Sequence, residues 1–247
     1  PKVEILPSGQ ILFSVRRGGG RQFNVFTYTD KATNAGSWAN NVNGCGNGGS
    51  NTCNGEIFCI DAKKADGSAV KLLLQSQPKG GSGLYDRRNV TIWYKEVTDA
   101  AYTSEQIAAD WTEGMQVSTQ LSSYSTMSLQ KDGKIAFFFE EAPCYDDNYA
   151  KGYSMVYIPL TIEQITMGNY GTPDVVIESV VGSYGIATFF ANEARTIPAG
   201  IEAYVATTEP EINNGSGILS LTKIEDGIIP AQTGAVICGS QGTYRFN

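Results

Sequence analysis

The sequence contains no histidine and few charged residues. Its 247 residues include 18 Lys and Arg against 25 Asp and Glu, which gives a formal net charge of −7 at pH 7. Without histidine the chain cannot build a Ser-His-Asp triad, a Cys-His pair or a histidine-ligated metal site. The acidic balance argues against nucleic acid as a partner, because phosphate neutralisation needs a basic surface. Any catalysis must therefore use carboxylates, Tyr, Lys, Ser or Cys.

Long apolar runs and paired cysteine motifs are also missing. No apolar stretch reaches the ~18–20 residues of a membrane span, and Pro1 opens directly into strand-like sequence without a signal peptide ahead of it. None of the five cysteines forms a Cys-x-x-Cys pair, so we expect no bound metal and no cofactor. A Cys45–Cys53 disulfide and free thiols are both open alternatives.

Short β-rich runs and Gly, Asn, Asp or Ser turns alternate along almost the whole chain, which predicts an all-β protein. Gly9 and Gly133 lie in turns at residues 7–10 and 131–134 and predict two hairpins, because glycine tolerates positive φ. The expected strands before residue 166 are 3–6, 11–15, 23–28, 56–60, 70–75, 90–95, 123–129, 135–139 and 154–158.

Helical signals are limited to two places. Thr103 is an N-cap ahead of good helix formers, and Thr161 opens a capping-box pattern with Gln164. Glycine, asparagine and proline interrupt the pattern at residues 167–173. We therefore expect one domain over residues 1–166 and a small β-module over residues 167–247.

Three phrases carry candidate chemistry. Arg16 ends the strand Ile-Leu-Phe-Ser-Val-Arg, Arg87 begins the phrase Arg-Arg-Asn-Val-Thr-Ile-Trp, and Tyr124 lies in Ser-Ser-Tyr-Ser-Thr-Met-Ser-Leu, which is followed by Asp-Gly-Lys-Ile-Ala-Phe-Phe-Phe-Glu-Glu. Together, and in this order, they resemble the second half of the catalytic domain of exo-α-sialidases of the Bacteroidetes type. The resemblance covers roughly residues 1–166 and implies about three blades of a six-bladed β-propeller.

The resemblance also implies roles for individual residues. Arg16 and Arg87 match the second and third arginines around the substrate carboxylate, Tyr124 matches the nucleophile, and Glu140 matches the carboxylate that steadies the first arginine. Glu56, which begins a strand next to the expected site, is a further candidate for a sugar contact. Arg17, Arg21 and Arg88 flank the matched arginines, and we expect them to be solvated rim charges.

This set of residue types suits a sialylated glycan as substrate. Guanidinium groups hold a carboxylate with two parallel hydrogen bonds and stay charged at neutral pH. A tyrosine is neutral at pH 7 and can approach an anionic sugar that would repel a carboxylate nucleophile; sialidases are the recognised exception to glycosidases with two catalytic carboxylates.

The family's remaining catalytic groups have no match in the sequence. The glutamate that activates the tyrosine would lie just ahead of Pro1, and the first arginine and the acid/base aspartate earlier still. We therefore expect the C-terminal portion of a larger, secreted, periplasmic or cell-surface sialidase, inactive by itself, with a missing N-terminal segment or a companion chain completing the propeller. The alternatives are a non-catalytic carbohydrate-binding or adhesin module, and a structural subunit completed by a second chain.

Overall fold

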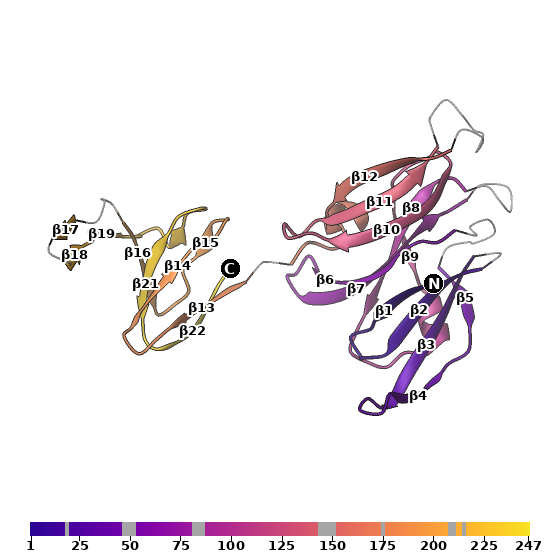
Figure 1. Cartoon of the computed structure of the whole chain (residues 1–247), viewed down its shortest axis with the longest axis horizontal. Coiled ribbons are helices and arrows are strands. Elements are labelled where there is room, and N and C mark those ends of the chain that lie inside the picture. The colour runs from indigo at the N-terminus through magenta and orange to yellow at the C-terminus, as the bar shows by residue number, and fades with distance from the viewer. Residues whose placement is uncertain are drawn as a thin grey trace. The chain divides into compact units, whose positions relative to one another are not determined.

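The computed structural model describes residues 1–17, 20–45, 53–80, 87–142, 152–173, 176–206, 211–213 and 216–247. The chain is all-β, with several antiparallel sheets and two short helices in these residues. It divides into two compact units, Pro1–Pro173 and Asp174–Asn247 (Figure 1). The strand-and-turn pattern of the sequence thus predicted the fold class.

The described residues of the first unit form three antiparallel sheets, each built from strands that follow one another along the chain. The first sheet comprises β1 (Lys2–Ile5), β2 (Ile11–Arg17), β3 (Gly20–Asp30) and β4 (Ala35–Trp38), and β5 (Val42–Gly44) also pairs with β3. The second comprises β6 (Ile57–Lys63), β7 (Ala69–Pro78), β8 (Val90–Val97) and β9 (Thr112–Gln116), and the third β10 (Ser122–Leu129), β11 (Ile135–Glu141) and β12 (Ser154–Leu160).

Both predicted hairpins are confirmed. Gly9 joins β1 to β2 with φ of 81°, and Gly133 joins β10 to β11 with φ of 79°. Residues with a Cβ rarely adopt this backbone conformation, so glycine at these positions lets each strand fold back on its predecessor.

The second sheet lies between the other two and is buried on both faces. Successive side chains of a strand point to opposite faces, and in β7 Leu73 packs with the first sheet while Leu72 and Leu74 pack with the third. Phe23 of β3 belongs to the first of these cores and Phe137 of β11 to the second. Apolar burial on both faces makes the second sheet the centre of the unit.

Two short capped helices close the ends of these cores. Helix α1 (Ser104–Ala108) begins after Thr103 and α2 (Ile162–Ile165) after Thr161, and each threonine forms a complete capping box. Ile107 in α1 and Ile165 in α2 are fully buried. Both helices that the capping residues predicted are therefore confirmed.

The first unit ends after Pro173, whereas the sequence pattern favoured a boundary after Thr166. Residues 167–173 stay with the first unit because Gly171 exchanges two backbone hydrogen bonds with Lys63, of 2.9 and 2.8 Å. The ring of Tyr170 also packs edge-on against Tyr94, with 5.8 Å between the ring centroids. Glycine and proline mark an irregular segment here, but its contacts attach it to the second sheet.

The second unit is a smaller all-β body. Its main sheet has the order β14 (Ile186–Phe189), β21 (Ala235–Gly239), β16 (Ile201–Ala206) and β19 (Leu221–Lys223). Three strand pairs accompany it: β13 (Ile177–Val181) with β22 (Gly242–Phe246), β15 (Arg195–Thr196) with β20 (Ile228–Ile229), and β17 (Glu211–Asn213) with β18 (Ser216–Ile218). Phe189, Ile237 and Phe246 lie in the apolar core that its described residues form.

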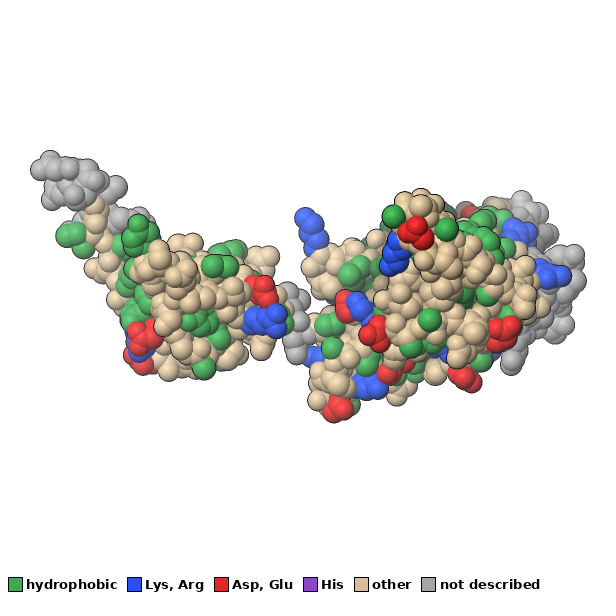
Figure 2. Space-filling model, turned by 90° about the horizontal axis from the view of Figure 1, so that it is seen from below, with side chains coloured by type: hydrophobic (Ala, Val, Ile, Leu, Met, Phe, Trp, Pro, Cys, Tyr) green, Lys and Arg blue, Asp and Glu red, His purple; other side chains and the backbone are tan. Residues whose placement is uncertain are grey.

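Acidic and basic side chains are interspersed over the face of the first unit that Figure 2 presents. Among the described residues, neither helix is long and apolar enough to cross a membrane.

Candidate functional site

The first sheet changes from apolar to charged along its inner face. Leu12, Ser14 and Arg16 succeed one another on the face of β2 that is directed at the second sheet, and their cross-strand partners on β3 are Val25, Phe23 and Arg21. Because cross-strand partners share a face, Arg16 and Arg21 lie on the same side of the sheet and at the same end.

The other two sheets become polar at the corresponding end. In β7, Leu72–Leu74 give way to Gln75, Ser76 and Gln77, all of which are fully buried. The Ser76 hydroxyl lies 2.8 Å from that of Ser125 in β10, and the Ser14 hydroxyl donates to Gln75 at 2.6 Å. Buried polar groups need such partners, so this end of the unit is held by a hydrogen-bonded layer instead of an apolar core.

The residues expected to bind and react with substrate meet above this layer. Nη1 of Arg16 donates to the hydroxyl of Tyr124 at 3.2 Å, and Nη1 of Arg87 donates to Oγ of Ser123 at 3.2 Å. Ser123 is buried and the next residue, Tyr124, is 41% exposed on the opposite face of β10. The structure thus brings Arg16, Arg87 and Tyr124 to one end of the first unit.

A buried thiol lies among these arginines. The Sγ atom of Cys53 is 3.9 Å from the Ser123 hydroxyl. Burial raises the pKa of Cys53, while the charges of Arg87, Arg16 and Arg21 act in the opposite direction. The sequence left open whether Cys45 and Cys53 form a disulfide or are free thiols. In the structure both are free thiols.

The prediction that Arg21 is a solvated rim charge is wrong. Its side chain is only 1% exposed, and its Nη1 and Nη2 atoms donate to the carbonyl oxygens of Cys53 at 3.1 Å and Gly55 at 2.7 Å. Desolvation lowers its pKa to about 10. β3 pairs with strands on both sides, and its inner face is covered by the second sheet, so a side chain there has no route to water. Arg17 is exposed as expected, and Arg88 is half-buried.

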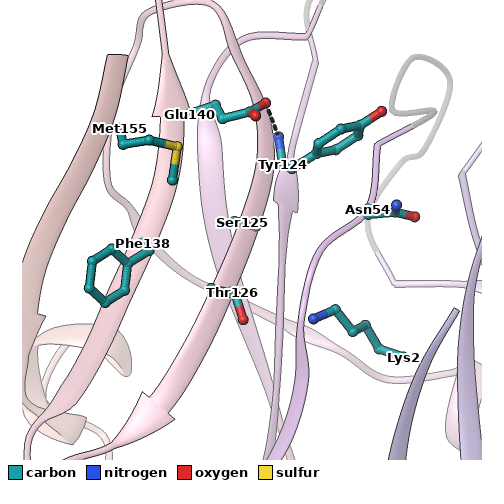
Figure 3. A pocket seen from close by; sticks show the side chains of 8 residues that line it. All are labelled: Lys2, Asn54, Tyr124, Ser125, Thr126, Phe138, Glu140 and Met155. Carbon is teal, nitrogen blue, oxygen red and sulfur yellow. Dashed lines mark hydrogen bonds between the residues drawn. The ribbon is translucent and has the colours of Figure 1, made fainter. Parts of the chain in front are cut away.

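A pocket of about 270 Å³ opens beside Tyr124 (Figure 3). Much of its wall is the outer face of the third sheet, where Glu140 accepts a hydrogen bond from the backbone N–H of Tyr124 at 3.1 Å. Phe138 and Met155 make one side of it apolar, and Lys2 and Asn54 lie at the other side. The full lining is Lys2, Asn54, Tyr124, Ser125, Thr126, Phe138, Glu140 and Met155.

Glu56 binds two of the residues that line this pocket. Its Oε2 atom accepts from Nζ of Lys2 at 2.7 Å and from the hydroxyl of Thr126 at 2.5 Å. Lys2 belongs to β1, Thr126 to β10, and Glu56 directly precedes β6, so this ion pair and hydrogen bond join the first strands of all three sheets. Glu56 therefore fixes two of the lining residues and does not itself line the pocket, so its role as a sugar contact stays a prediction.

Most of the residues that line the pocket were not among the candidates from the sequence. Thr126 could have been one of them, because residues two apart on a strand share a face and Tyr124 was already a candidate. Asn54 lies in the same Asn-Gly-Glu phrase as the candidate Glu56. Lys2 and Met155 gave no such signal, since they approach Tyr124 only through packing of separate segments. Within the described residues, no group of three or more Cys, Asp or Glu is placed to hold a metal ion.

Chemically, the site combines a cationic rim with an exposed phenol. Two guanidinium groups suit a carboxylate or another planar anion, and the phenol adds a neutral group able to act as a nucleophile once it loses its proton. The apolar side formed by Phe138 and Met155 suits the carbon skeleton of a ligand.

Comparison with known proteins gives no family assignment. No family model matches the chain, and no curated protein matches it. Among solved structures, an exo-β-1,3-galactanase from Phanerochaete chrysosporium, crystallised with β-1,3-galactotriose, matches with 7% identity and a TM-score of 0.32, over 97% of this chain and 64% of that chain. The chain thus spans less than two thirds of that protein's length, and a similarity this low assigns neither a fold family nor a function to it.

Proposed function

We propose that this chain is part of an exo-α-sialidase of the Bacteroidetes type, which releases terminal sialic acid from glycoconjugates with retention of configuration. The observation that carries the proposal is the hydrogen bond from Arg16 to the Tyr124 hydroxyl at 3.2 Å, with Arg87 bound to the preceding residue at 3.2 Å. These are the three residues that the sequence resemblance assigned to carboxylate binding and nucleophilic attack.

In the proposed reaction, Arg16 and Arg87 hold the carboxylate that sialic acid carries on its anomeric carbon. Tyr124 loses its proton to a general base, and its oxygen attacks that carbon while the bond to the glycan breaks and the departing oxygen takes a proton from a general acid. Water then attacks the same carbon and releases the sugar from Tyr124, which regains its proton. Two successive displacements at one carbon account for retention.

The proposed fold is half of a six-bladed propeller, completed by an N-terminal segment or a companion chain. This proposal is supported by apolar side chains on the two outer faces of the three-sheet stack. Val3, Ile5 and Trp38 of the first sheet are 52%, 65% and 52% exposed, and Tyr157 of the third is 46% exposed. Exposed apolar sheet faces are normally covered by further structure, as neighbouring blades would cover these.

Binding of N-acetylneuraminic acid to this chain tests the proposal directly. We expect Arg87→Ala to weaken the affinity by roughly 30-fold or more, because it removes a charged donor from the carboxylate. Arg17→Ala is the control, since Arg17 is an exposed arginine that directly follows Arg16 in β2. Galactose, which lacks the carboxylate, serves as the control sugar. Equal affinities for the two sugars, or no effect of Arg87→Ala, would contradict the proposal.

Hydrolysis of a fluorogenic sialoside separates the enzyme from a binding module. We expect turnover by the longest polypeptide that the gene encodes and none by this chain alone, because removal of several catalytic groups that act together costs more than one factor of about 10²–10⁴. Tight sialic acid binding without hydrolysis by the whole polypeptide would instead favour a carbohydrate-binding or adhesin module.

A further inference from the structure

A short irregular segment, residues 53–56, connects all three sheets beneath the pocket. The carbonyl oxygen of Asn54 accepts from the N–H of Ser125 in β10 at 3.3 Å. Glu56 exchanges two hydrogen bonds of 3.0 Å with Ser76 of β7, one from its N–H to the hydroxyl and one from the Ser76 N–H to its carbonyl. Hydrogen bonds therefore attach the 53–56 segment to the second and third sheets. The segment includes Asn54, which lines the pocket.

Arg21 attaches the same segment to the first sheet. Its two terminal nitrogens donate to the carbonyl oxygens of Cys53 and Gly55, on either side of Asn54, at 3.1 and 2.7 Å. A planar guanidinium that binds two carbonyls fixes both the position and the tilt of the peptide between them. A single-point donor such as an ammonium group cannot impose that tilt.

Gly55 shows how closely the segment is pressed on β7. A Cβ atom at this position would lie 1.6 Å from the carbonyl oxygen of Ser76, so no side chain fits there without a backbone shift. The segment is thus confined between β7 on one side and the Arg21 fork on another. Such confinement leaves Asn54 little freedom of position.

The burial of Arg21 is energetically expensive. Its Nε atom is buried without a hydrogen-bond partner, and among the described residues no carboxylate forms an ion pair with it. A buried guanidinium with only carbonyl partners is poorly compensated for its lost hydration. A methionine of similar length would serve apolar packing at lower cost, so stability of the core does not explain an arginine here.

We propose that Arg21 is a positioning residue, which sets the 53–56 segment and thereby holds Asn54 in the pocket beside Tyr124. Its effect on sialic acid rests on the proposed function, whereas its effect on the segment does not. Arg21 touches no substrate in this role and acts through the Cys53 and Gly55 carbonyls.

Amide hydrogen exchange at Ser125 reports the segment directly. The Ser125 N–H is bonded to Asn54, whereas the neighbouring Tyr124 N–H is bonded to Glu140, so one strand provides both the probe and its internal reference. We expect Arg21→Met to speed exchange at Ser125 by about tenfold or more, with exchange at Tyr124 and at Leu73 in the centre of β7 unchanged. We expect Arg21→Lys to give an intermediate rate.

Two further variants keep this test decisive. Gly55→Ala displaces the segment from the side of Ser76, so it should also speed exchange at Ser125 and marks the size of the effect. Arg17→Lys, at an exposed arginine of the same sheet, should change nothing. If Arg21→Met does not fold, the decision falls to Arg21→Lys. Exchange at Ser125 as slow in Arg21→Lys as in the unmodified chain, while Gly55→Ala accelerates it, would overturn the proposal.

Titration with N-acetylneuraminic acid forms the second arm. We expect Arg21→Lys to weaken binding roughly 5–10-fold through misplacement of Asn54, and Arg17→Lys to leave it unchanged. If the unmodified chain binds no sialic acid, the proposed function is refuted. The exchange rates at Ser125 would still test whether Arg21 positions the segment. Faster Ser125 exchange with unaltered sialic acid affinity would overturn the claim that the segment governs the pocket.

Discussion

The two units of this chain bury polar side chains very differently. The first unit contains a layer of buried polar residues at one end of its sheets, including Ser14, Arg21, Gln75, Ser76, Gln77 and Ser123. Among the described residues of the second unit, the buried polar side chain is Arg195, which pairs with Glu193 at 3.1 Å. Buried polar networks are costly unless fully bonded, so a whole layer of them indicates a region where placement of groups matters more than stability.

The units also differ in how their cores are built. In the first, a central sheet is covered on both faces and two separate apolar clusters result. The second has one small cluster, and apolar side chains such as Tyr184 and Phe190 remain 94% and 59% exposed. A small unit buries a smaller share of its surface on folding. We therefore expect chemistry and the larger stability in the first unit, and lower stability in the second.

The largest expected effect comes from a comparison of one tyrosine in each unit, Tyr124 in the first and Tyr204 in the second. In the polypeptide with sialidase activity, Tyr124→Phe should lower kcat by about 10³-fold or more and leave sialic acid affinity nearly unchanged, because only the attacking oxygen is removed. Tyr204→Phe in the second unit is the matched control, since that hydroxyl donates an exposed hydrogen bond to Glu202 of the same strand, β16. Steady-state kinetics on a fluorogenic sialoside measure both, and near-normal kcat in Tyr124→Phe would refute the nucleophile assignment.

Replacement of one core phenylalanine in each unit tests whether the two units unfold independently of each other. Phe137→Ala and Phe246→Ala each remove a fully buried ring, at a cost of about 3–5 kcal/mol. We expect urea unfolding to show two transitions, of which Phe137→Ala lowers only the more stable one and Phe246→Ala abolishes the less stable one. If each variant shifted both transitions together, the two units would form a single cooperative body.

A helix cap offers a smaller effect that is confined to the first unit. Thr161 accepts a hydrogen bond from the N–H of Gln164 and starts α2, whose Ile162 and Ile165 are buried. Thr161→Ala should therefore destabilise the first unit by about 1 kcal/mol, while Thr161→Ser keeps the cap and should cost less. The urea midpoint of the first unit's transition measures this difference, and equal midpoints for the two variants would show that the cap is unimportant.

The smallest expected effect is a loss of stability at alkaline pH, which is also confined to the first unit. Burial and the hydrogen bond to Glu96 raise the pKa of Tyr170 to about 12. The folded state then favours the protonated phenol, so its stabilisation is complete below pH about 10, the ordinary tyrosine pKa, and is lost as the pH rises toward 12. Tyr170→Phe should flatten this alkaline loss, as followed by the unfolding transition of the first unit between pH 9 and pH 12. An unchanged pH profile would exclude Tyr170 as its source.

Local chemistry explains which structural predictions were successful. Gly9 and Gly133 determine hairpin turns through positive φ, and Thr103 and Thr161 determine helix starts through their own side-chain hydrogen bonds. The two compact units divide after Pro173, at the end of the irregular segment 167–173, whereas the sequence pattern favoured a boundary at its start. Glycine and proline report local backbone irregularity, whereas the attachment of Gly171 depends on Lys63, more than a hundred residues earlier.

The sequence by itself determined the fold class, the hairpins, the helix caps and the candidate set of Arg16, Arg87, Tyr124, Glu140 and Glu56. Only the tertiary structure decided that Arg16 reaches Tyr124, that Lys2 and Asn54 complete the pocket, and that Arg21 is buried when it was expected in solvent. Turn and cap preferences act within a few residues and are therefore visible in the chain. The surroundings of an arginine depend on which sheet covers its strand, and that is set by packing between segments far apart in sequence.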